Sequence, residues 1–467
     1  MEDPRPPRIA LLSSPGLGHI IPFAELARHL VRSHRIAVTL ITHPADPSAT
    51  VDRALFNNLP DEVDTVCLPE FPPEDSLNGT TKLETRVSLT INANFPHLRS
   101  LLRAISSSAP LAALVIDVFC IDALDVASEF GIPAYLFVTC SCLALNFSFH
   151  LLKLDATFQG EYRDLPEPVR MPGCVPVQGT DFIETVQDRR SEAYNWFIRV
   201  TKRFYEAKGI LVNSFEDLEP GAAKALKEAD GVPPVYPVGP LVRAAPDEEN
   251  ECLRWLDRQP RGSVVYVCFG SGGTLTRAQT RELALGLEMS GQRFLWVVKS
   301  PHERDVTGTY FGDKSGKNPL DYLPEGFQER TKGVGFFVPS WAPQVAVLGH
   351  ASIGGFISHC GWNSTLESIV KGVPLIAWPL FAEQRLNAVL LNEDVEVALR
   401  PKVSESGLVQ RDEIASVVKR LMEGGEGKRL RKRAEELSHV AARSLGQEGS
   451  SVRALSEVAR EWMDRRT

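Results

Sequence analysis

The stretch Trp341–Gln384, WAPQVAVLGHASIGGFISHCGWNSTLESIVKGVPLIAWPLFAEQ, contains two transitions from a strand to a helix. Gly355–Ser358 and Val373–Trp378 are short apolar runs typical of buried parallel strands, and each runs into a polar turn that opens a helix. In doubly wound sheets, ligands bind at the carboxyl ends of the strands. The two turns, residues 359–363 and 381–384, are therefore expected to line one crevice.

The composition of the whole chain limits the classes of protein to which it can belong. With 467 residues, 43% of them hydrophobic, the chain is too long for one compact domain and can bury two cores. A formal net charge of −8 argues against nucleic acid or an anionic membrane as the main partner, because those surfaces select basic stripes. The start has no apolar signal region, and no run approaches the roughly 18 apolar residues of a membrane span. Eight scattered cysteines without a Cys-x-x-Cys pair predict buried free thiols, so we expect a cytoplasmic protein without stable membrane insertion.

Short β-branched runs alternate with helical patterns in both halves of the chain, which is typical of a parallel α/β fold. Helices are expected between the strands, among them 23–33 and 83–102. The pattern predicts two doubly wound, Rossmann-like domains. The expected strands are 8–13, 36–42, 111–116, 134–138 and 210–213 in the first half, and 263–269, 294–298, 355–358, 373–378 and 396–399 in the second.

A polar, acidic segment at residues 244–251 separates the two halves. We place an N-terminal domain at 1–240, a linker at 241–252 and a C-terminal domain at 253–450. Residues 451–467 are expected to form a C-terminal helix that packs back on the N-terminal domain. Residues 301–321, which are rich in Gly, Asp, Lys and Ser, are expected to form a mobile surface loop.

The polar turn after the strand 355–358 has two competing explanations. Asn363–Glu367 opens the next helix, and a helix N-terminus offers free N–H groups and a positive dipole to a diphosphate. Ser364 and Glu367 also have the spacing of a capping box, which would explain both residues without any ligand. His359 and Cys360 are adjacent on an extended segment, so their side chains diverge and no shared metal site is expected. The chain lacks an Asp-x-Asp pair, so a helix dipole and neutral donors would stabilise a leaving diphosphate.

Two polar side chains follow expected strands of the first half. His19 lies at a helix start just after the strand 8–13, where the dipole disfavours the imidazolium and keeps the ring ready to accept a proton. Asp117 ends the strand 111–116 and would be costly to bury without a cationic or N–H partner. A lone histidine is usually structural. If the two strands are neighbours, however, His19 and Asp117 form a dyad in which the carboxylate orients a general base.

Together these motifs resemble those of the plant secondary-product UDP-glycosyltransferases, nearly position for position in 341–384 and over essentially the full chain. The resemblance implies the GT-B architecture, in which two Rossmann-like domains face each other across a cleft. It also implies inverting, metal-independent transfer from a UDP-sugar, with His19 as general base and Asp117 as its partner. The segments 171–177 and 235–241 are most similar to the subgroup that includes hydroquinone and monolignol glucosyltransferases.

The resemblance further implies a donor site for UDP-glucose. Gln384, where galactose-using members carry His, is similar to the glucose-using members, whereas Glu383 departs from the Asp of many relatives. Trp341 would stack on uracil, a sensible use of an indole face. The other implied donor contacts are Ala342; Gln344 and Glu367 near the ribose; Ser14, Ser271, His359, Asn363 and Ser364 at the phosphates; and Ser141, Trp362, Glu383 and Gln384 at the sugar.

Aromatic residues near the acceptor edge suggest an apolar slot for a flat phenol, although each is individually more typical of a core. We therefore expect a monomeric enzyme without a cofactor that makes β-glucosides of small phenols. Transfer to nitrogen or carbon and a non-catalytic binder of nucleotide sugars or phenols remain alternatives. A nicotinamide-dependent oxidoreductase is disfavoured, because the glycine turn 269–274 lacks the third Gly of the dinucleotide fingerprint. The slot residues are Phe119, Phe147, Phe149, Phe182 and Trp196.

Overall fold

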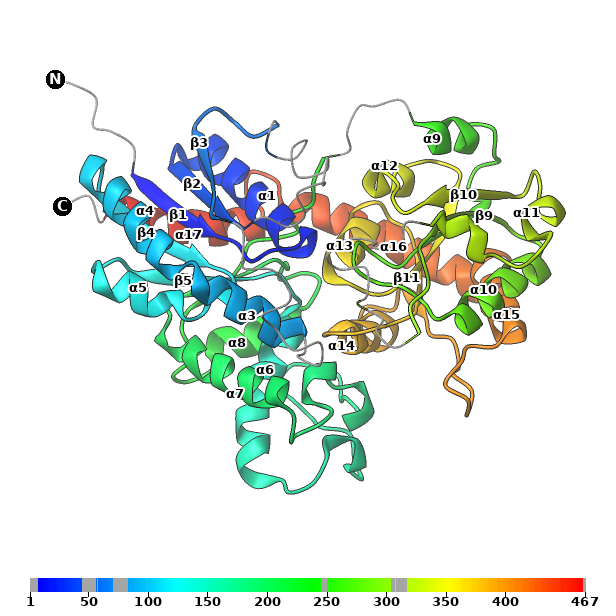
Figure 1. Ribbon diagram of the computed structural model, residues 1–467, viewed down its shortest axis with the longest axis horizontal. Helices are drawn as coiled ribbons and strands as arrows, with labels where there is room; N and C mark the ends of the chain where they lie inside the picture. Colours follow the sequence, from blue (N-terminus) through cyan, green and yellow to red (C-terminus); the bar gives the residue numbers. More distant parts are fainter. Residues whose placement is uncertain are drawn as a thin grey trace. The chain divides into compact units, whose positions relative to one another are not determined.

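The computed structural model describes residues 7–43, 56, 58–69, 83–244, 250–303, 307 and 317–464. The chain divides into two compact units, one of Met1–Val242 with Arg443–Thr467 and one of Arg243–Ala442. Each unit contains a parallel sheet with helices packed around it (Figure 1). The expected linker at 241–252 and the expected loop at 301–321 lie partly outside the described residues.

The first unit has a seven-stranded sheet in the order β3-β2-β1-β4-β5-β6-β7, and all neighbouring strands are parallel. Most of these strands are apolar along their whole length, as strands covered on both faces require. The strands are β1 (Arg8–Leu12), β2 (Ala37–Thr42), β3 (Val63–Cys67), β4 (Leu111–Ile116), β5 (Ala134–Val138), β6 (Ile210–Val212) and β7 (Val235–Pro237). The helices are α1 (Leu17–His34), α3 (Leu83–Ala93), α4 (Phe95–Ser108), α5 (Ala123–Glu129), α6 (Cys142–Thr157), α7 (Glu192–Arg203), α8 (Pro220–Glu228) and α17 (Ser450–Asp464).

The last helix of the chain, α17, belongs to the core of the first unit. Trp462 is fully buried, and its ring packs edge-on against Tyr135 with the centroids 5.4 Å apart. The Glu461 carboxylate accepts hydrogen bonds from the hydroxyls of Tyr135 at 2.8 Å and Tyr236 at 3.0 Å. The buried aromatic ring and a carboxylate that accepts two hydrogen bonds therefore fix this helix to the sheet.

The second unit has a six-stranded parallel sheet in the order β10-β9-β8-β11-β12-β13. The strands are β8 (Val264–Cys268), β9 (Arg293–Val298), β10 (Gly335–Pro339), β11 (Ile353–Ser358), β12 (Leu375–Ala377) and β13 (Ala398–Leu399). The helices are α9 (Glu251–Leu256), α10 (Arg277–Ser290), α11 (Phe327–Arg330), α12 (Gln344–Leu348), α13 (Trp362–Val370), α14 (Gln384–Val389), α15 (Arg411–Met422) and α16 (Gly425–Ser444). The prediction of an α/β fold with two doubly wound sheets is confirmed.

The strand order reverses at one place in each sheet, between β1 and β4 in the first unit and between β8 and β11 in the second. Loops that leave the carboxyl ends of two strands at such a reversal part to opposite faces and leave a crevice, where ligands of doubly wound sheets bind. The segments that contain His19, Asp117, the glycine turn 269–274 and His359 follow these four strands. The topology therefore selects the same candidate regions as the sequence motifs.

The structure corrects two expectations. The helix expected at 83–102 is two helices, α3 and α4, because Pro96 lies in the first turn of α4, where its missing N–H does not interrupt a helix. All eight cysteines are free and five of them are buried, but Cys140 and Cys174 are only partly buried, and Cys67 is exposed because β3 is an edge strand.

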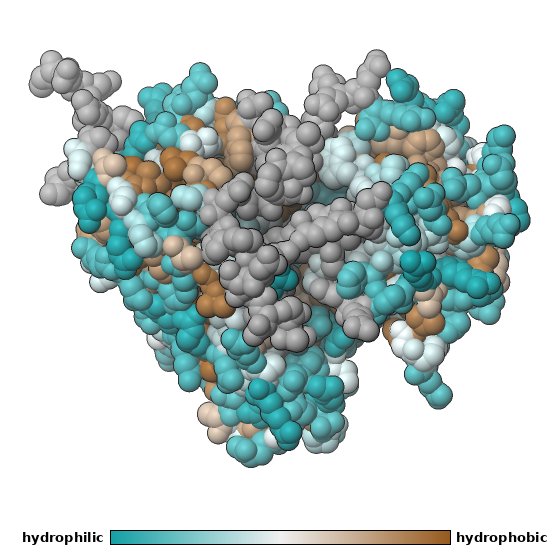
Figure 2. All heavy atoms as spheres, in the orientation of Figure 1, coloured by the Kyte–Doolittle hydropathy of each residue, from teal (hydrophilic) through white to brown (hydrophobic). Residues whose placement is uncertain are grey.

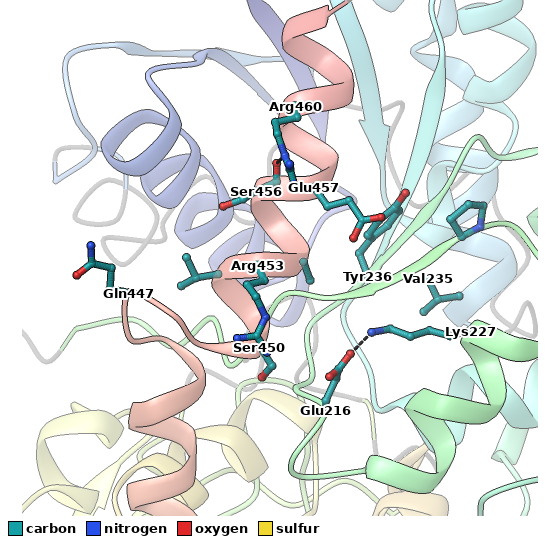
Figure 3. Close-up of a pocket in the computed structure, with 13 residues that line it drawn as sticks. Glu216, Lys227, Val235, Tyr236, Gln447, Ser450, Arg453, Ser456, Glu457 and Arg460 are labelled. Carbon is teal, nitrogen blue, oxygen red and sulfur yellow. Dashed lines mark hydrogen bonds and ion pairs between the residues drawn. The ribbon is translucent and has the colours of Figure 1, made fainter.

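The described part of the chain also has surface features outside these loops. On the face drawn in Figure 2, hydrophilic residues predominate and hydrophobic ones are scattered among them. No helix in the described part of the chain is long and apolar enough to cross a bilayer. A polar cavity of about 530 Å³ lies beside β7 in the first unit, lined by charged residues that include Lys227, Arg453 and Glu457 (Figure 3). None of the residues expected to act on substrate lines this cavity.

Candidate active site

His19 and Asp117 meet at the strand reversal of the first unit. Gly16, with a φ of 103°, makes the turn from β1 into α1 and puts His19 in the first turn of that helix. Asp117 directly follows β4 and is fully buried, and its Oδ2 lies 2.7 Å from His19 Nδ1. Its Oδ1 accepts a hydrogen bond from the backbone N–H of Phe119 at 3.0 Å, which fixes the carboxylate. Because an ionised carboxylate only accepts, Nδ1 of His19 carries the proton and Nε2 is the basic nitrogen.

Three further side chains surround the histidine ring. Thr139, the first residue after β5, has its Oγ1 3.3 Å from His19 Nδ1. Phe119 packs edge-on against the imidazole with the ring centroids 5.3 Å apart, and Trp196 stacks on Phe119 at 5.2 Å. The buried Trp196 Nε1 has no hydrogen-bond partner among the described residues. An aromatic wall with one available N–H donor therefore stands beside the base.

The other aromatics of the expected acceptor slot pack elsewhere in the first unit. Phe147 and Phe182 are almost completely buried and contact each other with their centroids 4.7 Å apart. Phe149 packs against Phe204 and Tyr205. The ring contacts of these three expected slot residues are thus with other aromatics, and only Phe119 contacts the ring of His19.

The two serines expected to approach the donor from the first unit are both fully buried. Ser14 Oγ has no hydrogen-bond partner among the described residues. Ser141 is the N-cap of α6, and its Oγ accepts a hydrogen bond from the backbone N–H of Ala144 at 3.1 Å. The buried Glu219 carboxylate accepts hydrogen bonds from the backbone N–H groups of Cys142 and Leu143, the first two residues of that helix. These bonds hold the turn around Ser141 in place.

In the second unit, His359 lies between two glycines at the strand reversal. A Cβ atom on Gly270 or on Gly361 would come within 2.4 Å of His359 Nε2, so neither position tolerates a side chain. Burial and, to a smaller extent, the nearby charge of Lys299 lower the pKa of His359 to about 3. The imidazole is therefore neutral at physiological pH, and its Nδ1 has no hydrogen-bond partner among the described residues.

Gln344 connects the residues expected at the ribose. Its Nε2 donates to Ser364 Oγ at 2.8 Å and to Glu367 Oε2 at 2.6 Å, while its Oε1 accepts from the buried Tyr266 hydroxyl at 3.3 Å. The capping-box explanation of Ser364 and Glu367 is wrong, because α13 begins at Trp362 with Gly361 as its N-cap. Both side chains are instead held by Gln344.

Burial raises the pKa of the Glu367 carboxyl from 4.5 to about 7, against the lowering effect of the hydrogen bond from Gln344. Between pH 4.5 and 7 the unfolded chain loses this proton while the folded chain keeps it, so stability falls as pH rises. Over this pH range the wild-type free energy of unfolding is expected to fall by about 3 kcal/mol because of Glu367, and Glu367→Gln is expected to abolish this fall. Thermal unfolding from pH 4.5 to 8 measures the effect, with the exposed Glu393→Gln as control. Parallel pH curves for wild type and Glu367→Gln would contradict the assignment.

The aromatic residues of the expected donor site differ in exposure. Trp341 follows β10 with 48% of its surface exposed, an unusual state for an indole and one that leaves a ring face available for stacking. Ala342 and Trp362 are buried, and each is next in the sequence to another expected donor residue. Trp341 is thus the one of these three that can offer a flat apolar surface to a base.

Glu383 and Gln384 form the turn from β12 into α14. Gln384 Oε1 accepts the backbone N–H groups of Leu380 and Phe381 at 2.9 and 3.0 Å, which leaves the amide nitrogen as the donating end. Asn387 joins this turn to the one after β11, donating to the Cys360 carbonyl at 2.9 Å and to Glu383 Oε1 at 3.2 Å. The turns after β11 and β12 are therefore one hydrogen-bonded surface.

Among the expected residues, contacts join His19 with Asp117 and Phe119 in the first unit, and Gln344 with Ser364 and Glu367 in the second. Sequence reasoning missed Thr139, Tyr266 and Asn387, which bond to the expected residues His19, Gln344 and Glu383 respectively. Thr139 carried a detectable signal, since it is a hydroxyl residue directly after a buried strand. Within the described ranges, no three His, Cys, Asp or Glu side chains gather as metal ligands do.

Comparison with known proteins assigns a family description to part of the chain. The family model described as "UDP-glucoronosyl and UDP-glucosyl transferase" matches residues 233–429. This range contains β8 to β13 and all the residues expected in the donor site of the second unit.

Individual relatives match over nearly the whole chain. UDP-glycosyltransferase 72B1 of Arabidopsis thaliana is 51% identical, covering 99% of this chain and 97% of its own length. The hydroquinone glucosyltransferase of Rauvolfia serpentina is 50% identical, with 98% of each chain covered. Among solved structures, UGT2 of Phytolacca americana, complexed with UDP-2fluoro-glucose and pterostilbene, is 48% identical with a TM-score of 0.88, covering 98% of this chain and 99% of its own.

Proposed function

This chain belongs to the UDP-glucoronosyl and UDP-glucosyl transferase family, and we propose that it transfers glucose from UDP-glucose to the hydroxyl group of a small phenol. The observation that carries the proposal is the 2.7 Å bond between His19 and the fully buried Asp117. A binding protein has no need for a histidine whose tautomer is fixed by a buried carboxylate. A general base has this need.

The proposed reaction is a single displacement with inversion at the sugar. Nε2 of His19 takes the proton of the phenol while the phenol oxygen attacks the anomeric carbon of glucose. The bond from that carbon to the diphosphate breaks, its electron pair leaves with UDP, and the product is a β-glucoside. Asp117 stabilises the imidazolium that forms during the transfer.

Most of the proposed donor contacts lie in the second unit. Trp341 would stack on uracil, and Glu367 with Gln344 would hold the ribose, since a carboxylate accepts hydroxyl hydrogen bonds that an amide can share. The neutral His359, with Asn363 and Ser364 at the start of α13, would donate to the phosphates. The proposed sugar contacts are Trp362, Glu383, Gln384 and, from the first unit, Ser141, with Ser14 and Ser271 on the phosphate side.

A flat aromatic acceptor is supported by the wall beside His19. Phe119 and the stacked Trp196 offer apolar faces, and the indole N–H can donate to a second polar group of the acceptor. One relative is named a hydroquinone glucosyltransferase and one solved relative is complexed with pterostilbene, and both of these small molecules are phenols. Transfer to nitrogen or carbon uses the same base and donor, so it stays the alternative within the same reaction class.

The proposal predicts a hexose adduct in a direct assay. Purified protein is incubated with UDP-glucose or UDP-galactose and a panel of phenols and anilines, and products are identified by mass spectrometry. We expect adducts on phenols that form faster from UDP-glucose, that β-glucosidase removes, and that EDTA does not reduce. UDP binding without an adduct on any acceptor would support the non-catalytic binder instead, and acid-stable adducts would indicate a carbon linkage.

The remaining parts of the proposal concern the state of the protein in the cell. Its eight free thiols suit a reducing compartment, so we propose that it acts in the cytoplasm. The base and the donor residues belong to one chain, which supports action as a monomer without a cofactor. Light scattering of the purified protein tests the monomer.

A further inference from the structure

We propose that Lys299 is an additional binding residue for the diphosphate of the donor, an inference that rests on the function proposed above. Lys299 is the first residue after β9, which is the neighbour of β8 in the second sheet. It therefore stands at the same carboxyl edge as the glycine loop 270–273 and His359.

Hydrogen bonds fix Lys299 against this loop. Its half-buried side chain donates from Nζ to the backbone carbonyl of Ser271. The loops after β8 and β9 are also joined by the Thr274 hydroxyl, which donates to the Ser300 carbonyl at 2.6 Å, and by the His302 N–H, which donates to the Leu275 carbonyl at 3.1 Å. The ammonium group is thus held at the loop that packs against the ring of His359.

The positive charge of Lys299 can balance negative charge of the diphosphate that the other expected phosphate ligands leave unbalanced. His359 is neutral because burial lowers its pKa to about 3, with a smaller contribution from Lys299 itself. Ser271, Asn363 and Ser364 are uncharged side chains, and the helix dipole of α13 supplies the equivalent of roughly half a charge. A diphosphate carries more negative charge than these groups balance, and this charge grows on the leaving group as the sugar is transferred. The ammonium group of Lys299 provides a full positive charge beside them.

A structural role is the alternative, in which Lys299 only anchors the Ser271 carbonyl. Both roles leave uridine unchanged, because uridine has no phosphate and Ser271 lies on the phosphate side of the proposed site. The two roles differ in their dependence on charge. A lysine that binds the diphosphate affects UDP more than UMP and makes UDP binding sensitive to salt, whereas a lysine that only shapes the loop leaves the salt dependence of UDP binding the same in the variant and in wild type.

Calorimetric titration of the full-length protein with UDP, UMP and uridine tests the inference. We expect Lys299→Ala to weaken UDP binding about tenfold, UMP binding less and uridine binding not at all. Lys299→Arg keeps most of the affinity, and the exposed Lys332→Ala behaves as wild type. Added salt weakens UDP binding to wild type more than to Lys299→Ala, because salt screens the attraction between the Lys299 ammonium and the diphosphate, which the variant lacks.

Two results would overturn the inference alone. One is a UDP affinity in Lys299→Ala within twofold of wild type, and the other is a salt dependence of UDP binding that is the same in Lys299→Ala and in wild type. A wild-type protein that binds no UDP would instead overturn the proposed function and this inference with it. The three results are distinguishable in one set of titrations.

Discussion

Replacement of His19 by alanine is expected to lower kcat/KM for phenol glucosylation about a thousandfold, within the range that general-base catalysis contributes. The imidazole is the only proton acceptor that Asp117 orients in the described part of the first unit, and alanine leaves no group to take the phenol proton. His19 is not among the proposed donor contacts, most of which lie in the second unit, so the affinity for UDP is expected to stay within twofold of wild type.

The control for this change is His97→Ala, which removes an exposed histidine of the same unit. Steady-state rates with UDP-glucose and one phenol, together with calorimetric UDP affinities, are measured for both variants. Undiminished turnover in His19→Ala would refute the proposed mechanism. A parallel loss of UDP binding would indicate a wider structural change.

Asp117→Asn is the second change with a large expected effect, a loss of about a hundredfold to a thousandfold in kcat. Asparagine has nearly the same shape and its Oδ1 can still accept the N–H of Phe119, so the fold is expected to persist. It carries no charge to stabilise the imidazolium, and its amide N–H₂ favours the histidine tautomer with the proton on Nε2. The base is then present but blocked by its own proton.

A double-mutant cycle separates this explanation from general damage. Because the two side chains act as a unit, the variant with both His19→Ala and Asp117→Asn is expected to be no slower than His19→Ala alone. Losses that multiply in the double variant would show that Asp117 acts independently of His19. Rates are compared at saturating UDP-glucose, and circular dichroism checks that the four proteins are equally folded.

Several parts of the site were predictable because they follow from local rules. Asp117, Thr139, Lys299 and His359 are each the first residue after a buried parallel strand, where side chains reach the ligand edge of a doubly wound sheet. Asp117 and His359 were selected on this basis. Thr139 and Lys299 satisfy the same rule and were missed because a hydroxyl or an ammonium group after a strand is also common on ordinary surfaces.

Other parts were not predictable, because they depend on which side chains meet across the fold. The five aromatics of the expected slot look alike in sequence, yet only Phe119 contacts the His19 ring and Trp196 stacks on Phe119, while Phe147 and Phe182 pack on each other. The pairing of Ser364 and Glu367 matched a capping box, but Gln344 from another helix bonds to both. Such contacts join residues distant in the chain, and no local pattern encodes them.

The sequence alone determined the α/β class, the two doubly wound sheets and the strand-terminal positions of His19, Asp117 and the 341–384 turns, because hydrophobic period and glycine placement are local properties. The tertiary structure alone decided the partners: the Asp117 carboxylate on His19, the Gln344 amide on Glu367 and the ammonium of Lys299 on the glycine loop. Burial also made His359 neutral, with a smaller contribution from the charge of Lys299, and burial raised the pKa of Glu367. Desolvation and hydrogen bonding depend on the whole surrounding of a group, which exists only once the chain has folded.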